Sequence, residues 1–99
     1  MNRFLYFGLS ATDSACVPVS DVSGMEIADA DTIELYYEGM GNIDNAGKIT
    51  IDCTSGSSKE AMKTIVDAMN HATEPFIVVS DVVNGISLGH GLTVTTIAL

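Results

Sequence analysis

Residues 32–54, TIELYYEGMGNIDNAGKITIDCT, contain two segments in which apolar and polar side chains alternate. The apolar positions are Ile33, Leu35 and Tyr37 in the first segment, Thr32–Glu38, and Ile49, Ile51 and Cys53 in the second, Lys48–Thr54. A period of two is typical of a strand with one buried face. The residues between them, 39–47, include three glycines and two asparagines, as loops do. The stretch therefore predicts an antiparallel hairpin.

A helix follows the hairpin, over about residues 57–70. Ser57 and Glu60 have the spacing of a capping box at its start, while Asn70 and Pro75 end it. Apolar residues recur at helical spacing along one stripe, namely Met62, Ile65, Val66 and Met69. The sequence thus predicts one amphipathic helix that covers a sheet.

Shorter strands are expected on both sides of this unit. They are Arg3–Leu9, Cys16–Val19, Met25–Ala28, Phe76–Val79 and Leu92–Leu99, with Ala11–Ala15 as a loop. Pro18 marks its strand as an edge or irregular strand, and the unbroken apolar run of Phe76–Val79 is interpreted as a buried strand. Val82 and Val83 are expected to continue the Phe76–Val79 strand past a bend at Asp81, and Asn84-Gly85 predicts a hairpin turn.

These elements predict one domain, residues 1–99, of mainly β (α+β) class. Strands and helices do not alternate regularly, which disfavours a doubly wound parallel sheet. The first interpretation is a small, partly open Sm-like or SH3-like barrel of five or six antiparallel strands with one helix. The second is a bent antiparallel sheet with the helix across it.

The amino-acid composition indicates which kinds of partner this chain can bind. The chain is 46% hydrophobic and 17% charged, with a net charge of -9. Few charges suggest that another copy covers part of the surface, so we expect a homo-oligomer; a surface rich in Ser, Thr, Asn and Gly is the alternative. The basic residues are Arg3, Lys48, Lys59 and Lys63. They are too few and too scattered for nucleic acid or an anionic membrane to be a partner.

No run approaches the roughly 20 apolar residues of a membrane span. The N-terminal residues lack a signal-peptide pattern, so cytoplasmic synthesis with reduced thiols is expected. Cys16 and Cys53 match no metal-ligand or redox spacing. We expect both to be buried as small apolar side chains.

The residue spacings in this chain do not match those of nucleotide-binding or calcium-binding motifs. Gly41–Lys48 has five residues between its glycines, where a phosphate loop needs four, and Ile49 replaces the hydroxyl residue. The acidic pairs Asp29/Asp31 and Asn42/Asp44 do not continue into a calcium loop, because the closing position after Asn42 falls on Cys53. Solvated turn carboxylates are the simpler interpretation.

The two histidines have no helical metal-pair spacing. His71 lies near the predicted helix end, where a cation is favoured by the dipole. His90 lies between two glycines and is the more exposed candidate base, without a nucleophile beside it in sequence. The aromatic side chains of Phe4, Tyr6 and Phe7 suit a strand buried on both sides or in a subunit contact rather than a base-stacking platform.

Several stretches together resemble a known group of proteins. They are FLYF (4–7), ACVPVSDVSGM (15–25), KEAMKTIVDAMN (59–70), PFIVVSDV (75–82) and VTTIAL (94–99). In this order they are similar to short proteins encoded by marine bacteriophages, including phages of cyanobacteria. The resemblance implies a structural protein of the virion that decorates or cements a capsid, with other virion proteins as partners.

The function expected from the sequence is therefore a self-assembling, non-enzymatic structural protein, located in the virion if phage-encoded and otherwise in the cytoplasm. No catalytic, cofactor-binding or metal-binding residue is assigned, and no cofactor is expected. Two alternatives remain: an Sm-like, ring-forming binding module, and a small hydrolase or metal protein that uses His90 with Asp81 or Asp44.

Overall fold

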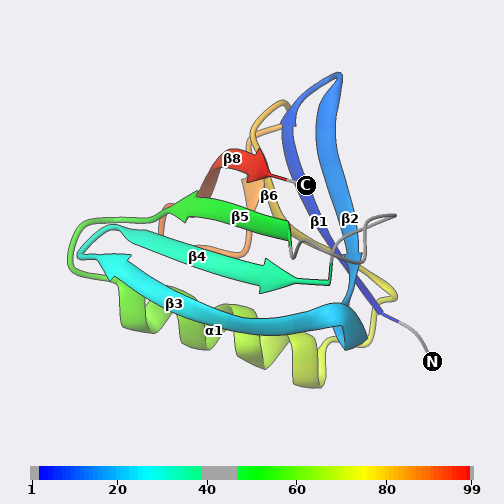
Figure 1. Cartoon of the computed structure of the whole chain (residues 1–99), viewed down its shortest axis with the longest axis horizontal. Helices are drawn as coiled ribbons and strands as arrows, with labels where there is room; N and C mark the ends of the chain where they lie inside the picture. The colour runs from blue at the N-terminus through cyan, green and yellow to red at the C-terminus, as the bar shows by residue number, and fades with distance from the viewer. Residues whose placement is uncertain (1–2, 39–46, 99) are drawn as a thin grey trace.

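The computed structural model describes residues 3–38 and 47–98, which form a mainly β fold with one α-helix in the described part (Figure 1). In chain order the elements are β1 (Phe4–Ser10), β2 (Asp13–Pro18), the 3-10 turn η1 (Val19–Asp21), β3 (Val22–Asp29), β4 (Thr32–Tyr37), β5 (Gly47–Asp52), α1 (Ser58–His71), β6 (Phe76–Asp81), β7 (Ile86–Ser87) and β8 (Thr93–Ala98). The expected class is confirmed.

The strands form two four-stranded sheets that do not close into a barrel. The first sheet has the order β2-β1-β6-β7 and the second has the order β3-β4-β5-β8. In Figure 1, α1 lies beneath the second sheet, against β3 and β4, and β1 and β2 rise at the other end of the molecule. β8 contacts β1 and β6, and the Val94 N–H donates to Ser80 Oγ at 3.1 Å, which joins the sheets.

The predicted hairpin is β4–β5. Its register pairs Ile33 with Ile51 and Leu35 with Ile49, and these four side chains are fully buried. The alternation of residues 32–54 was sufficient here because the two strands are close in sequence and one face is buried.

β1 pairs with β2 in antiparallel fashion but with β6 in parallel, from Phe4↔Phe76 onward. An entirely antiparallel arrangement was therefore wrong. Most of the chain lies between β1 and β6, including α1, and such a long crossover is what parallel pairing requires. β1 is also not buried on both sides, because Leu5 and Phe7 are fully buried whereas Phe4 and Tyr6 are only partly buried.

The start of α1 differs from the expected capping box. Ser57 is at the N-cap position, as predicted, but its side chain makes no capping hydrogen bond. Instead, the neighbouring Ser58 Oγ donates to the Asp29 carbonyl at 2.9 Å. The hydroxyl therefore anchors the helix start to the end of β3 rather than satisfying a helix N–H.

The buried stripe of α1 is narrower than predicted. Ala61 and Ile65 are fully buried, and Met62 and Met69 pack partly against the core. Val66 is 37% exposed, so its assignment to the buried stripe was wrong. The main contacts of the helix are with β3 and β4 of the second sheet, so a narrow stripe of α1 is covered and Val66 lies outside it.

Two segments near the turns also differ. Asp13–Ala15, expected in a loop, belong to β2 because Ser10 and Asp13 already pair across the turn. Val82 and Val83 do not extend β6 but lie in the turn before β7. The hairpin expected at Asn84-Gly85 is confirmed by the β6–β7 pairing. β7 was not expected as a strand, and the described residues contain eight strands, where a barrel of five or six was expected.

Candidate functional site

The outward face of the first sheet is apolar. Strand pairing and burial place on it Phe4, Tyr6, Cys16, Pro18, Phe76, Val78 and Ile86, a set called the apolar face below. The rings of Tyr6 and Phe76 pack at 5.2 Å between centroids and 36° between planes. Phe76 is 48% exposed and Ile86 is 53% exposed, so the face is open to solvent. A contiguous apolar surface is characteristic of a protein contact.

The outward face of the second sheet is polar by contrast. Lys48 Nζ lies 3.1 Å from Glu34 Oε2, and Tyr36 Oη donates to Glu34 Oε1 at 3.1 Å. The hydrogen bond from Lys48, then that from Tyr36, lowers the pKa of the Glu34 carboxyl, and Glu34 raises the pKa of Lys48. Because the outward side chains of the second sheet are solvated and paired with one another, the first sheet is the face that is better suited to a partner.

A groove of about 520 Å³ runs along the edge of the apolar face. It is lined by Ala68 and His71 of α1, by Ala72, Thr73 and Glu74 after the helix, by Phe76, Ile77 and Val78 of β6, and by Ile86, Ser87 and Leu88 in and after β7. Most of these side chains are apolar. The groove therefore extends the exposed apolar surface into a depression.

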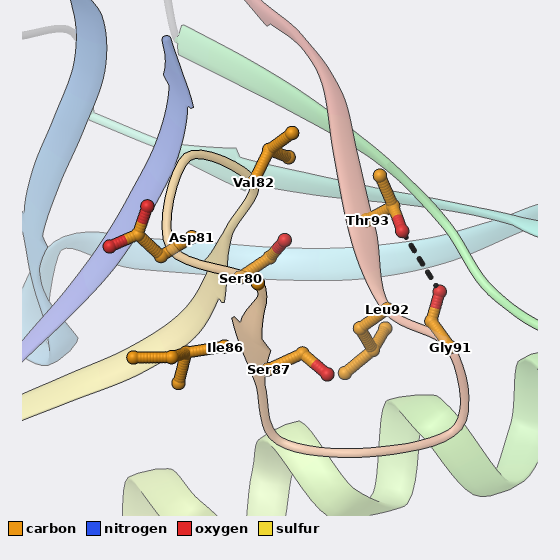
Figure 2. A pocket seen from close by; sticks show the side chains of 9 residues that line it. Ser80, Asp81, Val82, Ile86, Ser87, Gly91, Leu92 and Thr93 are labelled. Carbon is orange, nitrogen blue, oxygen red and sulfur yellow. Dashed lines mark hydrogen bonds between the residues drawn. The ribbon is translucent and has the colours of Figure 1, made fainter. Parts of the chain in front are cut away.

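A second hollow, of about 260 Å³, lies between the β6–β7 turn and the start of β8. Figure 2 shows that the Asp81 carboxylate points toward β1, whereas the Ser80 hydroxyl points to the other side, toward β8. The Asp81 carboxylate accepts hydrogen bonds from the Asn84 backbone at 3.3 Å and side chain at 2.8 Å. Both groups have structural partners, so the hollow does not present a nucleophile next to a free base.

His90 lies outside both depressions. Its ring has no hydrogen-bond partner in the described residues, and its carbonyl accepts from the Thr54 N–H at 2.8 Å. Its φ of 56° is in the left-handed region, where histidine is enriched relative to most residues. The left-handed backbone conformation of this turn is a sufficient reason for a histidine at position 90. The structure does not bring it together with Asp81, and Asp44 lies outside the described residues.

The first of the acidic pairs is a solvated turn. The Asp31 N–H donates to Asp29 Oδ1 at 3.1 Å. Hydrogen bonds from Asp31 lower the pKa of Asp29, and hydrogen bonding to Asp29 followed by its negative charge raises the pKa of Asp31. Within residues 3–38 and 47–98, no three His, Cys, Asp or Glu side chains are placed to hold a metal ion. Asn42, Asp44 and most of Gly41–Lys48 lie outside the described residues.

The two cysteines are in different environments. Cys53 is buried, as predicted, with Sγ 3.7 Å from Ser58 Oγ. Cys16 is exposed on the apolar face, so its expected burial was wrong. Cys16 lies on β2, which is an edge strand, as Pro18 predicted. The even-numbered residues of β2 face outward. Partial burial raises the pKa of the Cys16 thiol. His71 is exposed at the helix end, as expected.

Sequence reasoning did not identify Phe76, Val78 and Ile86 as a surface. The run FIVV in β6 was interpreted as a buried strand, since an unbroken apolar run does not show which alternate positions face out. The sequence offered one indication that this strand is exposed, namely the position of Phe76 directly after Pro75 at the start of the strand.

Comparison of the chain with protein-family models, with curated proteins and with solved structures found no match in any of the three. Among the described residues, no helix has the length and apolar character needed to cross a bilayer.

Proposed function

We propose that this protein is a non-enzymatic structural protein that assembles with copies of itself through the apolar face. The observation that carries the proposal is the open Tyr6–Phe76 ring pair on a sheet whose outward side chains are mostly apolar. Large aromatic side chains left in water are unfavourable, and a second protein surface is the usual way to cover them.

Charge favours a second copy at this position. Each chain carries a net charge of -9, so two copies repel each other wherever their acidic surfaces meet. The carboxylate on the outward side of the first sheet, Asp81, is buried and hydrogen-bonded by Asn84. The apolar face is thus a region on which like-charged copies can approach closely.

The size of the face indicates how it is used. The three longer strands, spaced by about 4.8 Å and about 20 Å long, give a projected area of about 300 Å², to which the short β7 adds little. A stable pairwise interface buries about 800 Å² on each partner, so one contact through this face is weak. Many weak contacts repeated by symmetry become strong together, as in a shell or lattice. The resemblance to short marine-phage proteins supports a place in the virion, as a capsid decoration or cement protein.

Light scattering coupled to size-exclusion chromatography tests the proposal. The wild-type chain is expected to increase in mass with concentration, and Cys16→Glu is expected to remain a monomer because it places a charge on the apolar face. Thr96→Glu, an exposed position on the second sheet, is the matched control and is expected to behave as wild type.

Cys16 is also a reporter of the same face. Its alkylation by iodoacetamide is expected to slow as protein concentration rises, while the buried Cys53 stays unreactive throughout. A constant mass together with a constant Cys16 alkylation rate across the whole concentration range would overturn the proposal.

A further inference from the structure

β6 lacks a neighbour along half of one edge. On one side it pairs with β1 from Phe76 to Asp81. On the other side, β7 pairs only with Ser80 and Asp81, and the Leu88 N–H adds one bond to the Val79 carbonyl at 3.2 Å. Among the described residues, no strand pairs with Phe76–Val78 on that side. Unpaired strand edges of this kind bind another extended chain.

This open edge lies in the groove, not on a flat surface. Phe76, Ile77 and Val78 form one side of the groove, and the end of α1 with Ala68 and Ala72 forms another. β7 and Leu88 continue the line that an added strand would follow. Three paired residues of β6 span about 10 Å, so the groove matches about three or four residues of an extended chain. Its 520 Å³ falls within the range of about 300–1,000 Å³ that ligand sites occupy.

The charges around the groove select among occupants. Glu74 is exposed at its rim and makes no ion pair with any residue in the described ranges. The C-terminal end of α1, which carries the negative end of the helix dipole, is also at the groove. Arg3 Nη1 donates to the Ala72 carbonyl at 3.1 Å, so this guanidinium offsets the dipole at the helix end, and the charge at the rim that has no ion pair among the described residues is that of Glu74. The groove therefore favours a cationic segment.

A second copy of this chain is a poor occupant. Two other edges of its sheets, β2 and β3, carry Asp13, Glu26 and Asp29 and would bring carboxylates toward Glu74, while β8, Thr93–Ala98, has no charged residue and offers Glu74 no cation. Each chain's net charge of -9 adds to the repulsion between two copies.

We propose that the groove binds an extended segment of a different protein by strand addition to Phe76–Val78, the segment having apolar residues at alternate positions and a Lys or Arg beside Glu74. The backbone pairing supplies affinity, the apolar walls accept every second side chain, and Glu74 selects for a positive charge. This inference goes beyond self-assembly through the apolar face, and because the two sites share Phe76, Val78 and Ile86, the Cys16→Glu variant is used below to separate them.

The test is NMR titration of the isotope-labelled full chain with three blocked hexapeptides. The first alternates valine with lysine and threonine, the second has glutamate in place of lysine, and the third has proline in place of the central valine. The lysine peptide at millimolar concentration is expected to shift the amide signals of Ile77, Val78 and Ser87. The glutamate peptide is expected to bind about two- to fivefold more weakly, as one or two exposed ion pairs allow. The proline peptide is expected to leave these signals unchanged, since it cannot complete the ladder.

Glu74→Lys supplies the charge test. The variant is expected to reverse the preference, so that the glutamate peptide binds more tightly than the lysine peptide. Glu60→Lys, an exposed change at the opposite end of α1, is the matched control and is expected to keep the wild-type preference. The Cys16→Glu variant is expected to bind the lysine peptide normally, which separates this site from the self-assembly contact.

Three results would overturn the inference. The first is no shift at the β6 and β7 amides with any peptide. The second is equal binding of the proline peptide, which would show that no strand is added. The third is a shift of the same amides with protein concentration in the Cys16→Glu variant, whose apolar face no longer assembles, which would make a second copy the occupant of the groove.

Discussion

The ring of Tyr37 lies against the backbone of Gly47, its direct partner across the β4–β5 hairpin. Tyr37 is fully buried, and a Cβ built on Gly47 would overlap its ring atoms. The glycine is needed here for space and not for an unusual backbone angle, since its φ is not in the left-handed region.

Gly47→Ala is therefore expected to lower the free energy of unfolding by about 1–3 kcal/mol, the range for overpacking in a core. Chemical denaturation measures the change. Gly24→Ala is the matched control in β3, where an added Cβ meets nothing within 4 Å. Equal stability of both variants would show that the Tyr37 ring moves aside freely.

Asp81 is expected to hold the β6–β7 turn through Asn84. Because its buried carboxylate accepts the Asn84 backbone and side-chain N–H groups, Asp81→Ala should destabilise the fold by about 1–3 kcal/mol. Asn84→Ala should cost less, and the double variant should be less destabilised than the sum of the two. Additive losses in this denaturation cycle would contradict a direct Asp81–Asn84 interaction.

The pH dependence of Asp31 follows from its neighbour. Asp29 raises the pKa of the Asp31 carboxyl in the folded state. Ionisation of Asp31 therefore lowers the free energy of unfolding, and this loss is recovered as the pH falls through the folded-state pKa. Asp31→Asn is thus expected to raise the melting temperature slightly at neutral pH. The gain should shrink in acid, where the wild-type carboxyl is protonated. Thermal scans across pH measure it, with the exposed Asp67→Asn as control. A gain that does not depend on pH would refute the electrostatic cause.

His90 should respond to backbone preference and not to loss of a proton donor. At a φ of 56°, His90→Val is expected to destabilise by about 1–2 kcal/mol, while His90→Asn is expected to be nearly neutral, because asparagine tolerates the left-handed region. Thermal denaturation of the pair decides this. If both variants lose the same stability, the ring and not the backbone is responsible.

How far the sequence predicts the fold depends on how local each signal is. The β4–β5 hairpin and the position of α1 were predicted because their patterns lie within short segments. The edge position of β2 was predicted from Pro18, which cannot donate to a ladder. The parallel pairing of β1 with β6 was not predictable, since nothing in FLYF or FIVV specifies a partner so distant in sequence.

The candidate surface was predictable only in part. The aromatic run at Phe4–Phe7 suggested a subunit contact, and two of its rings do face outward. The other half of the apolar face comes from β6 and β7, whose outward positions depend on the irregular register between β1 and β6 near Val79. The groove depends on β7 being shorter than β6, which the Asn84-Gly85 turn signal does not specify.

The parallel β1–β6 ladder also governs the order of events during synthesis on the ribosome. Phe4 pairs with Phe76, so the central strand of the first sheet emerges long before the strand that completes it. Until the chain has been translated past Asp81, the nascent β1–β2 hairpin has an uncovered, aromatic flank that is open to wrong partners. Formation of the first sheet is thus a late step with a high contact order, and we expect it to limit the rate of folding.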